Sequence, residues 1–446
     1  MPSPLLLKHG VIADPSPSAP RVLYDHALLI EEGRIARIAP YREFEESDVP
    51  VLDLSGRIVL PGFINLHTHL YSTFARGLHA IQPAADFTGV LKNLWWKLDR
   101  ALTVDACYYS AIPVLLEAIR SGTTTIVDHH ASPMAVRGSL EALQRALLDT
   151  GVRGCLCYEV SDRDGEKVAE AGIEENAAFL ASCGKDDGAM VRGLFGLHAS
   201  FTLSDRTLES AVAAAHASDA GFHIHVAEAP ADQETTQWLS GVRVVERLHR
   251  NGILGERTVA AHAVHVKDAE MDLLASTGTV VAHNPQSNMN NAVGIADLER
   301  LRAHGVAVGL GTDAMTHDMR QELRVGLWAQ RLKQASPSAG FTALTEALWR
   351  VNPMMAGRLF GMPIGMMTPG AAADLIALEY DPPTPLTNDS LPGHLVFGIA
   401  SAPVDTTIIG GRVVMYQRKL RLDLDEKEVM AKVRESASEV WRRLSN

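Results

Sequence analysis

Two histidines separated by one residue close the apolar segment Val59–Leu70, whose sequence is VLPGFINLHTHL. Side chains two residues apart on a strand point to the same face, so His67 and His69 are able to bind one metal ion. Such a pair also occurs as packed, hydrogen-bonded core residues, and the pair alone does not decide between the two. A metal site requires further ligands at the ends of later strands.

From Pro61 onward, helical stretches alternate with short apolar runs, and each run ends in a residue that binds metal or moves protons. These residues are His67, Asp128, Glu159, His198, His225, His262, His283 and Asp313. Strands that alternate with helices over about 250 residues are typical of a parallel barrel. We therefore expect an α/β fold with a (β/α)8 TIM-like barrel, in which these side chains lie together at the carboxyl ends of the strands.

Three imidazoles and one carboxylate at these strand ends form a candidate metal site. His67, His69 and His225 supply nitrogen donors, and Asp313 supplies oxygen. The set suits Zn²⁺ with water in a remaining position, although Fe²⁺ accepts similar ligands. We expect one divalent ion that converts its water to hydroxide near neutral pH, with Asp313 accepting the proton.

Two further residues suit roles in proton transfer and orientation. Glu228 stands three residues after His225 in the motif HVAE, where it is placed to relay a proton to the substrate. His262 is expected to orient the hydroxide or to polarise the bond under attack. A single histidine is usually structural, but six of them with two carboxylates at strand ends favour a metal site.

The segments that flank the barrel have β character. Residues 1–60 contain short apolar runs separated by glycine, proline and charged turns, with Glu31–Gly33 suited to a tight hairpin. After Asp313 the chain is expected to be helical to about 361, followed by strands and a charged helix over 424–442. The expected strands are Asp374–Leu378, His394–Phe397 and Thr406–Val414. We expect three parts: 1–60 and 365–446 as the two halves of one β module, and 61–364 as the metal-dependent barrel.

An insertion over 71–105 carries FARGL and NLWWKLDR between the first two barrel strands. One interpretation is that Trp95 and Trp96 pack a long helix onto the barrel. The other is a lid whose aromatic face covers a flat substrate. On the second interpretation, Trp95 and Arg76 contact the substrate.

Composition limits the partners. The net charge of −12 and the pI near 5.8 argue against nucleic acid or an anionic membrane. The first residues, MPSPLLLKHG, lack the pattern of a signal peptide, and no run of about 18 apolar residues suggests a membrane span. The four cysteines form no CxxC pair, which favours packing roles and a reducing cytoplasm.

The motifs PGFINLHTH, HVAE, AHAVH, AHNPQSNMNN and GLGTD together resemble the amidohydrolase superfamily, in its chlorohydrolase and aminohydrolase branch. The stretches FARGL, NLWWKLDR, DHHASP and HNPQSNMNNAVG are similar to SsnA-type aminohydrolases. The resemblance implies the same four metal ligands, proton transfer by Glu228 and assistance from His262. It also implies a urease-like β-sandwich built from both termini, and a homo-oligomer.

The resemblance further places His198, His283, Ser287 and Asn288 along the substrate pocket. Two departures, ASFT at 199–202 and the tract NMNNAVG, are expected to change the substrate. No lysine stands at a strand end in the first half of the barrel, so a lysine carbamate bridging two metals is not expected. Glu159 is the one candidate for a bridging carboxylate, and a structural role for it is favoured.

One of His129 and His130, which follow Asp128, should face the rim, and we assign the substrate contact to His130. The leading hypothesis for function is hydrolytic deamination of an amino-substituted heterocycle by a metal-bound hydroxide. The alternatives are hydrolysis of a cyclic amide or another C–N or C–Cl bond, and a catalytically silent interaction protein. The silent protein should have lost metal ligands, whereas all four are present. The signature of zinc cytidine deaminases is absent.

Overall fold

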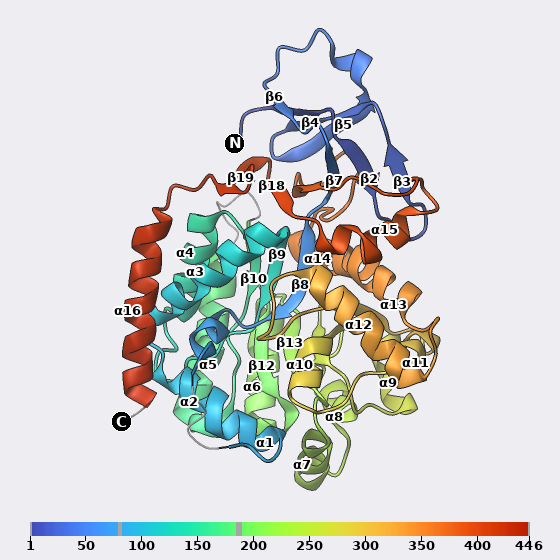
Figure 1. Cartoon of the computed structure of the whole chain (residues 1–446). Coiled ribbons are helices and arrows are strands. Elements are labelled where there is room, and N and C mark those ends of the chain that lie inside the picture. Colours follow the sequence, from blue (N-terminus) through green and yellow to red (C-terminus); the bar gives the residue numbers. More distant parts are fainter. Residues whose placement is uncertain (1, 79–82, 184–189, 445–446) are drawn as a thin grey trace.

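Two parallel sheets form the centre of the protein in a computed structural model that describes residues 2–78, 83–183 and 190–444 (Figure 1). The 4-stranded sheet has the order β11-β10-β9-β8, and the 5-stranded sheet has the order β12-β13-β14-β15-β16. The strands are β8 (Phe63–Thr68), β9 (Thr123–Asp128), β10 (Arg153–Leu156), β11 (Val191–Gly193), β12 (Phe195–Ala199), β13 (Phe222–Val226), β14 (Val259–His262), β15 (Val280–His283) and β16 (Ala307–Leu310). Neighbouring strands are parallel throughout, which confirms the α/β class.

The apolar run that ends at His198 is divided between the two sheets. Its first part, β11, pairs with β10, while its second part, β12, pairs with β13. The sheets also meet at a parallel bridge between Thr68 and Asp313. Beside that bridge, the buried Asn352 amide donates to the carbonyl oxygens of Ile64 (2.7 Å) and Leu310 (2.9 Å), which ties β8 to β16. The strand ends that carry the candidate residues therefore lie together.

Helices cover the strands, and their sequence signals match their bounds. In α11, Asp297 caps the helix by accepting from the Arg300 amide (3.1 Å), and Leu298 and Leu301 are buried on one face. Glycines with positive φ end α3 and α4. The barrel helices are α1 (Phe87–Val90), α2 (Trp96–Ala101), α3 (Val104–Ser121), α4 (Ser139–Thr150), α5 (Glu166–Ser182), α6 (Asp205–Ala217), α7 (Pro230–Ser240), α8 (Val244–Arg250), α9 (Asp268–Ser276), α10 (Pro285–Asn290), α11 (Leu298–Ala303), α12 (Met319–Gln334), α13 (Phe341–Glu346) and α14 (Asn352–Phe360).

Strands from both ends of the chain share a 7-stranded sheet with the order β20-β19-β18-β17-β7-β2-β3. A separate 4-stranded sheet has the order β5-β4-β1-β6. These strands are β1 (Leu5–Lys8), β2 (Val11–Asp14), β3 (Arg21–Leu23), β4 (His26–Glu31), β5 (Arg34–Pro40), β6 (Val51–Asp53), β7 (Arg57–Pro61), β17 (Leu375–Glu379), β18 (Val404–Ile409), β19 (Arg412–Tyr416) and β20 (Lys419–Leu420). One hydrophobic core, which includes Leu28 and Leu375, joins the two sheets. Glu32 (φ 51°) and Gly33 (φ 74°) form the expected hairpin turn between β4 and β5.

The expected strand His394–Phe397 is wrong, because this segment belongs to helix α15 (Leu391–Phe397). Pro392 occupies the first turn, where its missing amide hydrogen costs nothing, and Leu391 and Leu395 lie one turn apart and are buried. Residues 1–60 also contain a 3-10 turn over Tyr41–Phe44. The terminal helix is α16 (Glu426–Leu444), which packs against α3.

Across the described residues, the helices individually lack the length and apolar character needed to cross a membrane. A pair of helical segments, Phe87–Ala101 and Val104–Ser121, meets those criteria only when the two are taken together, and it is bent by 113°.

A buried ion pair joins the parallel sheets to the β module. The Arg153 guanidinium donates from Nε (2.7 Å) and Nη2 (3.0 Å) to the two oxygens of Asp374, which also accepts from the Gly410 amide (2.6 Å). Both residues are 1% exposed. Removing one partner therefore leaves an uncompensated charge in the interior.

We expect Arg153→Met to lower the free energy of unfolding by about 3–5 kcal/mol, because the Asp374 carboxylate is left buried without its cation. Denaturant unfolding followed by circular dichroism measures this change. Arg137→Met, which breaks the exposed ion pair with Glu174, is the matched control and should change stability by less than about 1 kcal/mol. Equal losses in the two variants would contradict this account of the buried pair.

Candidate active site

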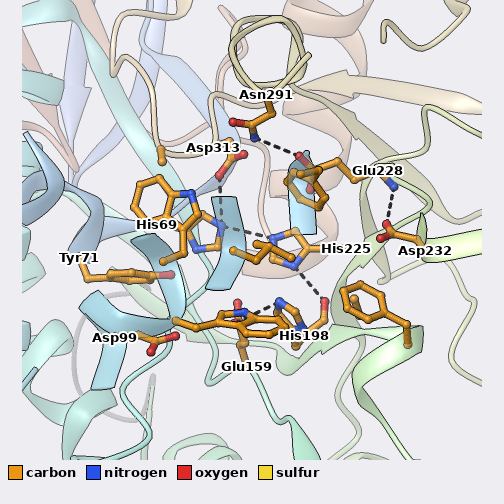
Figure 2. Close-up of a pocket in the computed structure, with 17 residues that line it drawn as sticks. His69, Tyr71, Asp99, Glu159, His198, His225, Glu228, Asp232, Asn291 and Asp313 are labelled. Carbon is orange, nitrogen blue, oxygen red and sulfur yellow. Dashed lines mark hydrogen bonds and ion pairs between the residues drawn. The ribbon is translucent and has the colours of Figure 1, made fainter. Parts of the chain in front are cut away.

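Histidines from three strands and one carboxylate form a compact cluster at the carboxyl ends of the strands. The ring Nε2 of His69 lies 3.2 Å from Asp313 Oδ1 and 3.3 Å from His225 Nε2. His67 Nε2 lies 3.9 Å from the same Asp313 oxygen. The potential ligand atoms of His67, His69, His129 and His225 all lie within 4.8 Å of one another. Figure 2 shows His69, His225 and Asp313 pointing toward one another.

The second nitrogen of each ligand histidine is already engaged. His69 Nδ1 donates to the His129 carbonyl (2.5 Å), and His225 Nδ1 donates to the His198 carbonyl (2.9 Å). His67 Nδ1 lies 2.9 Å from Nε2 of the buried His223, and His67 Nε2 has no hydrogen-bond partner among the described residues. These contacts turn the Nε2 atoms toward the cluster. The donor set therefore fits a divalent metal ion.

Glu228 and His262 lie beside this cluster. His262 Nε2 is 3.5 Å from Glu228 Oε2 and 4.0 Å from Asp313 Oδ2. The Asn291 amide donates to Glu228 Oε1 (3.3 Å), and the Asp232 carboxylate accepts from the backbone amide of Glu228 (2.8 Å). Burial, followed by the nearby charges of Asp313 and Asp232, raises the pKa of Glu228 well above its ordinary value. The raised pKa favours the protonated form of Glu228, as a general acid requires.

The pKa values of the neighbouring groups are shifted in different directions. Burial lowers the pKa of His262 to about 4, so this ring is neutral at pH 7. Burial opposes ionisation of Asp313, but hydrogen bonding and the charge of His69 outweigh it and lower the pKa of Asp313. Carboxyl groups whose environments push their pKa values apart are typical of an acid and a base in one site.

Strained backbone positions occur where the strands deliver these side chains. His262 (φ 76°), Asp313 (φ 54°) and Ala227 (φ 48°) are non-glycine residues in the left-handed region. Each such residue costs about 1–3 kcal/mol unless its surroundings impose the conformation. Ser287 holds the turn at Asp313 by donating a short hydrogen bond to Oδ2, and the Asn288 amide donates to His262 Nδ1 (2.8 Å).

Aromatic side chains form the outer wall of the pocket, whose empty volume including its open mouth is about 570 Å³. The apolar lining residues are Tyr71, Phe87, Leu91, Trp95, Trp96 and Phe201. The Trp96 ring lies over the Arg163 guanidinium (5.4 Å), and the Tyr71 and Trp95 rings meet edge to face (6.3 Å). The tryptophans of the 71–105 insertion therefore both pack and line the pocket, although residues 79–82 of that segment lie outside the described residues.

The structure separates the expected substrate contacts into two groups. His198 and Trp95 line the pocket, whereas Ser287, Asn288 and the fully buried His283 lie behind it. His130 is turned away, because its Nε2 contacts Ser132 Oγ (2.9 Å), and the neighbouring His129 faces the cluster instead. Neither histidine lines the pocket, so His130 is not retained as a substrate contact.

Arg76 points away from the pocket and forms a two-point ion pair with Glu117 (2.5 and 2.6 Å). It does not belong to the lining, so we remove it from the proposed substrate contacts. The lining also includes Asp99, Asp232 and Asn291, which sequence reasoning missed. The sequence could have indicated Asn291. This residue caps the C-terminus of α10 and lies four residues after Ser287, so the two share one face of the helix.

Comparisons with known proteins agree with this architecture. A model of the amidohydrolase family matches residues 58–414. A 5'-deoxyadenosine deaminase of Methanothermobacter thermautotrophicus is 32% identical over 420 residues, covering 93% of this chain and 94% of the relative. A 5-methylthioadenosine/S-adenosylhomocysteine deaminase of Desulfitobacterium hafniense is 30% identical over 418 residues, covering 92% of each chain. The crystal structure of an adenosine deaminase from Xanthomonas campestris with bound zinc has a TM-score of 0.84 at 22% identity, covering 98% of this chain and 99% of that one.

We expect His67→Asn to weaken Zn²⁺ binding at the cluster by more than about 100-fold, because a direct ligand contributes more than the outer partners, which are worth 10–100-fold. Competition with a chromophoric chelator measures the dissociation constant of the tightest Zn²⁺ site. His216→Asn, on the exposed face of α6, is the control and should leave it unchanged. Unaltered affinity in His67→Asn would remove this residue from the metal site.

Proposed function

The chain belongs to the amidohydrolase family, and we propose that it is a metal-dependent deaminase that hydrolyses the exocyclic C–N bond of an aminopurine nucleoside. The observation that carries the proposal is Glu228, whose pKa is raised, in a pocket that it shares with His69, His225 and Asp313 of the cluster. The relatives that are at least 30% identical over most of the chain support the nucleoside. The aromatic wall suits a flat base.

We propose His67, His69, His225 and Asp313 as the ligands of the catalytic ion, with Zn²⁺ as the preferred metal. A divalent ion held there supplies a Lewis acid that lowers the pKa of water toward neutrality. The Asp313 carboxylate accepts the proton of the attacking water. His262 Nε2 lies between Glu228 and Asp313 and orients that water toward the ring carbon bearing the amino group.

Glu228 supplies the proton that the ring requires. Its carboxyl group donates to the ring nitrogen next to the carbon under attack, so negative charge does not build up on the base. Asn291 fixes the orientation of the carboxyl group through Oε1. After water has added, the C–N bond breaks, and the amino group leaves as ammonia with the proton taken up at Asp313. The hydroxyl proton of the adduct passes to the Glu228 carboxylate as the carbonyl group forms, so both carboxyl groups return to their starting state.

We also propose that the two parallel sheets form one closed barrel over residues 61–364. The division of the fourth strand into β11 and β12 and the bridge between Thr68 and Asp313 support closure. Residues 1–60 and 365–446 then form the two halves of a composite β-sandwich, which agrees with the shared 7-stranded sheet.

We expect the metal-loaded protein to release ammonia from 5'-deoxyadenosine and 5'-methylthioadenosine, and Glu228→Gln to lower kcat/KM by about 10²–10⁴-fold because the general acid is lost. A coupled ammonia assay measures both. Glu234→Gln, on the exposed face of α7, is the matched control. The variant should keep its metal, which separates loss of the acid from loss of the ion. Unchanged turnover in Glu228→Gln would exclude this mechanism.

Asp232→Asn tests the electrostatic control of the acid through pH. The pKa of Asp232, which burial raises to about 6, leaves this group ionised above pH 7, and its charge helps to raise the pKa of Glu228. Removing that charge lowers the pKa of Glu228, so Glu228 loses its proton at a lower pH. The alkaline limb of the kcat profile should therefore move to lower pH, while the asparagine oxygen still accepts from the Glu228 amide. A limb that stays in place or moves upward would contradict this role.

A further inference from the structure

The short helix α10 and the residue that ends it contact three residues of the proposed mechanism. These hydrogen bonds run from Ser287 to Asp313 Oδ2, from Asn288 to His262 Nδ1 (2.8 Å) and from Asn291 to Glu228 Oε1 (3.3 Å). Figure 2 shows the last of these bonds beside the pocket. The position of α10 therefore affects the proposed acid, the proposed base and the orienting histidine together.

Helix α10 is too short to hold its own position. It has six residues, and isolated helices shorter than about 12–15 residues are marginal in water. The residue at its N-cap, Asn284, makes no capping hydrogen bond through its side chain, and Pro285 in the first turn has no amide hydrogen. The first backbone amide of α10 is therefore that of Gln286, which needs an acceptor from another part of the chain.

Glu322 of helix α12 supplies this acceptor. Its Oε1 accepts from the backbone amide of Gln286 (2.9 Å), and its Oε2 accepts from the Gln286 side-chain amide (2.6 Å). Glu322 is 0% exposed, so both bonds are shielded from water. Because two bonds join the same pair of residues, they fix both the distance and the orientation of α10 relative to α12, which lie against each other (Figure 1).

A glycine allows the two helices to approach closely at this point. Gly326 lies one turn after Glu322 on α12, and a Cβ atom there would lie 3.2 Å from Pro285 Cγ. Helix α12 is also the helix that follows Asp313 in the chain. Asp313 is thus connected to α10 twice, through the chain that leads to Glu322 and through the hydrogen bond from Ser287.

We propose that Glu322 is a positioning residue of the active site, which acts through Gln286 and α10. Glu322 is not among the described residues that line the pocket or form the metal cluster. It holds α10 where this helix can orient the groups that transfer protons. The inference rests on the proposed function, and it assigns Ser287 and Asn288 to the support of those groups rather than to contact with the substrate.

Loss of the Glu322 carboxylate should slow turnover more than it weakens substrate binding. We expect Glu322→Ala to lower kcat by about 10–100-fold, as for partners that orient catalytic groups, and to change KM by less than about threefold. The full-length, zinc-loaded protein is assayed for ammonia release from 5'-methylthioadenosine, with rates normalised to bound zinc. Gln286→Ala, which removes one of the two bonds, should lower kcat by a smaller factor.

Glu175 gives a matched control, because it caps another helix in the same way. This α5 side chain is buried, and its carboxylate accepts from the backbone amides of Gly138 and Leu140 (both 3.0 Å) at the start of α4. Helix α4 contributes no residue to the described lining of the pocket. Glu175→Ala should therefore lower stability, as Glu322→Ala does, but leave the kcat of the folded protein unchanged.

The conservative variant Glu322→Gln should restore turnover to within about threefold of the wild type. Its amide oxygen still accepts from the Gln286 backbone, and its amino group donates to the Gln286 side chain once that amide turns over. Burial raises the pKa of Glu322 to about 8, so a neutral side chain suits this site. Rescue by glutamine separates the positioning of α10 from a general requirement for charge.

Hydrogen exchange followed by mass spectrometry tests the anchoring of α10 without any substrate. In Glu322→Ala, the amides of α10 should exchange about tenfold faster or more, while those of α4 keep the wild-type rate. Glu175→Ala should show the reverse. A wild type that releases no ammonia would contradict the proposed function, whereas exchange in α10 still decides whether Glu322 anchors this helix.

Three results would overturn the proposal. The first is an unchanged kcat or an unchanged exchange rate of α10 in folded Glu322→Ala. The second is an equal loss of kcat in Glu175→Ala, which would indicate a general effect of stability. The third is Glu322→Gln that turns over as slowly as Glu322→Ala.

Discussion

The convergence of imidazole lone pairs and carboxylates at the ends of parallel strands is the constraint on which the rest of the structure depends. His69, His225 and His129 each donate a ring hydrogen to a backbone carbonyl, so the fold itself decides which nitrogen faces the cluster. Such a set of buried acceptors is unfavourable without a cation. The fold must therefore hold an arrangement that its own hydrogen bonds cannot satisfy, and binding of a divalent metal ion would offset that cost.

The scaffold meets this demand by tying strands together with buried side chains near the site. Asn352 bridges the backbones of β8 and β16. The Asn65 amide donates to the hydroxyl of Thr312, the residue before Asp313 (2.7 Å). These contacts fix the register between the strand that carries His67 and the segment that carries Asp313. A register shift of one residue would turn His67 and His69 away from the cluster, because side chains alternate along a strand. The positive φ values at His262 and Asp313 persist for the same reason: the surrounding hydrogen bonds determine them.

The sequence was sufficient for the parallel α/β architecture and for the members of the first cluster, because both follow from periodic patterns. Each apolar run ends in a functional residue, and parallel strands bring such ends to one edge. It was insufficient where the answer depends on contacts between distant residues. The residues next to His129 and His130 in the sequence do not show which of the two rings faces the cluster. The orientation of His129 depends on its contacts with carbonyl oxygens of β12 and β13. Arg76 is taken by Glu117, which lies 41 residues away. His394–Phe397 has apolar residues that suit a strand, but Pro392 and the burial of Leu391 favour a helix.

Each of the five carboxyl groups that line the pocket has a different set of neighbours. Asp313 faces His69, which lowers its pKa, Glu228 faces other carboxylates, which raise its pKa, and Asp99 faces Arg163. Asp232 faces backbone amides, and Glu159 faces imidazoles. Five carboxylates of equal charge in one cavity would repel one another and bind any cation without selectivity. In the proposed mechanism, proton transfer is therefore assigned to Asp313 and Glu228, and the aromatic wall formed by Trp95 and Trp96 is proposed to contact the flat base.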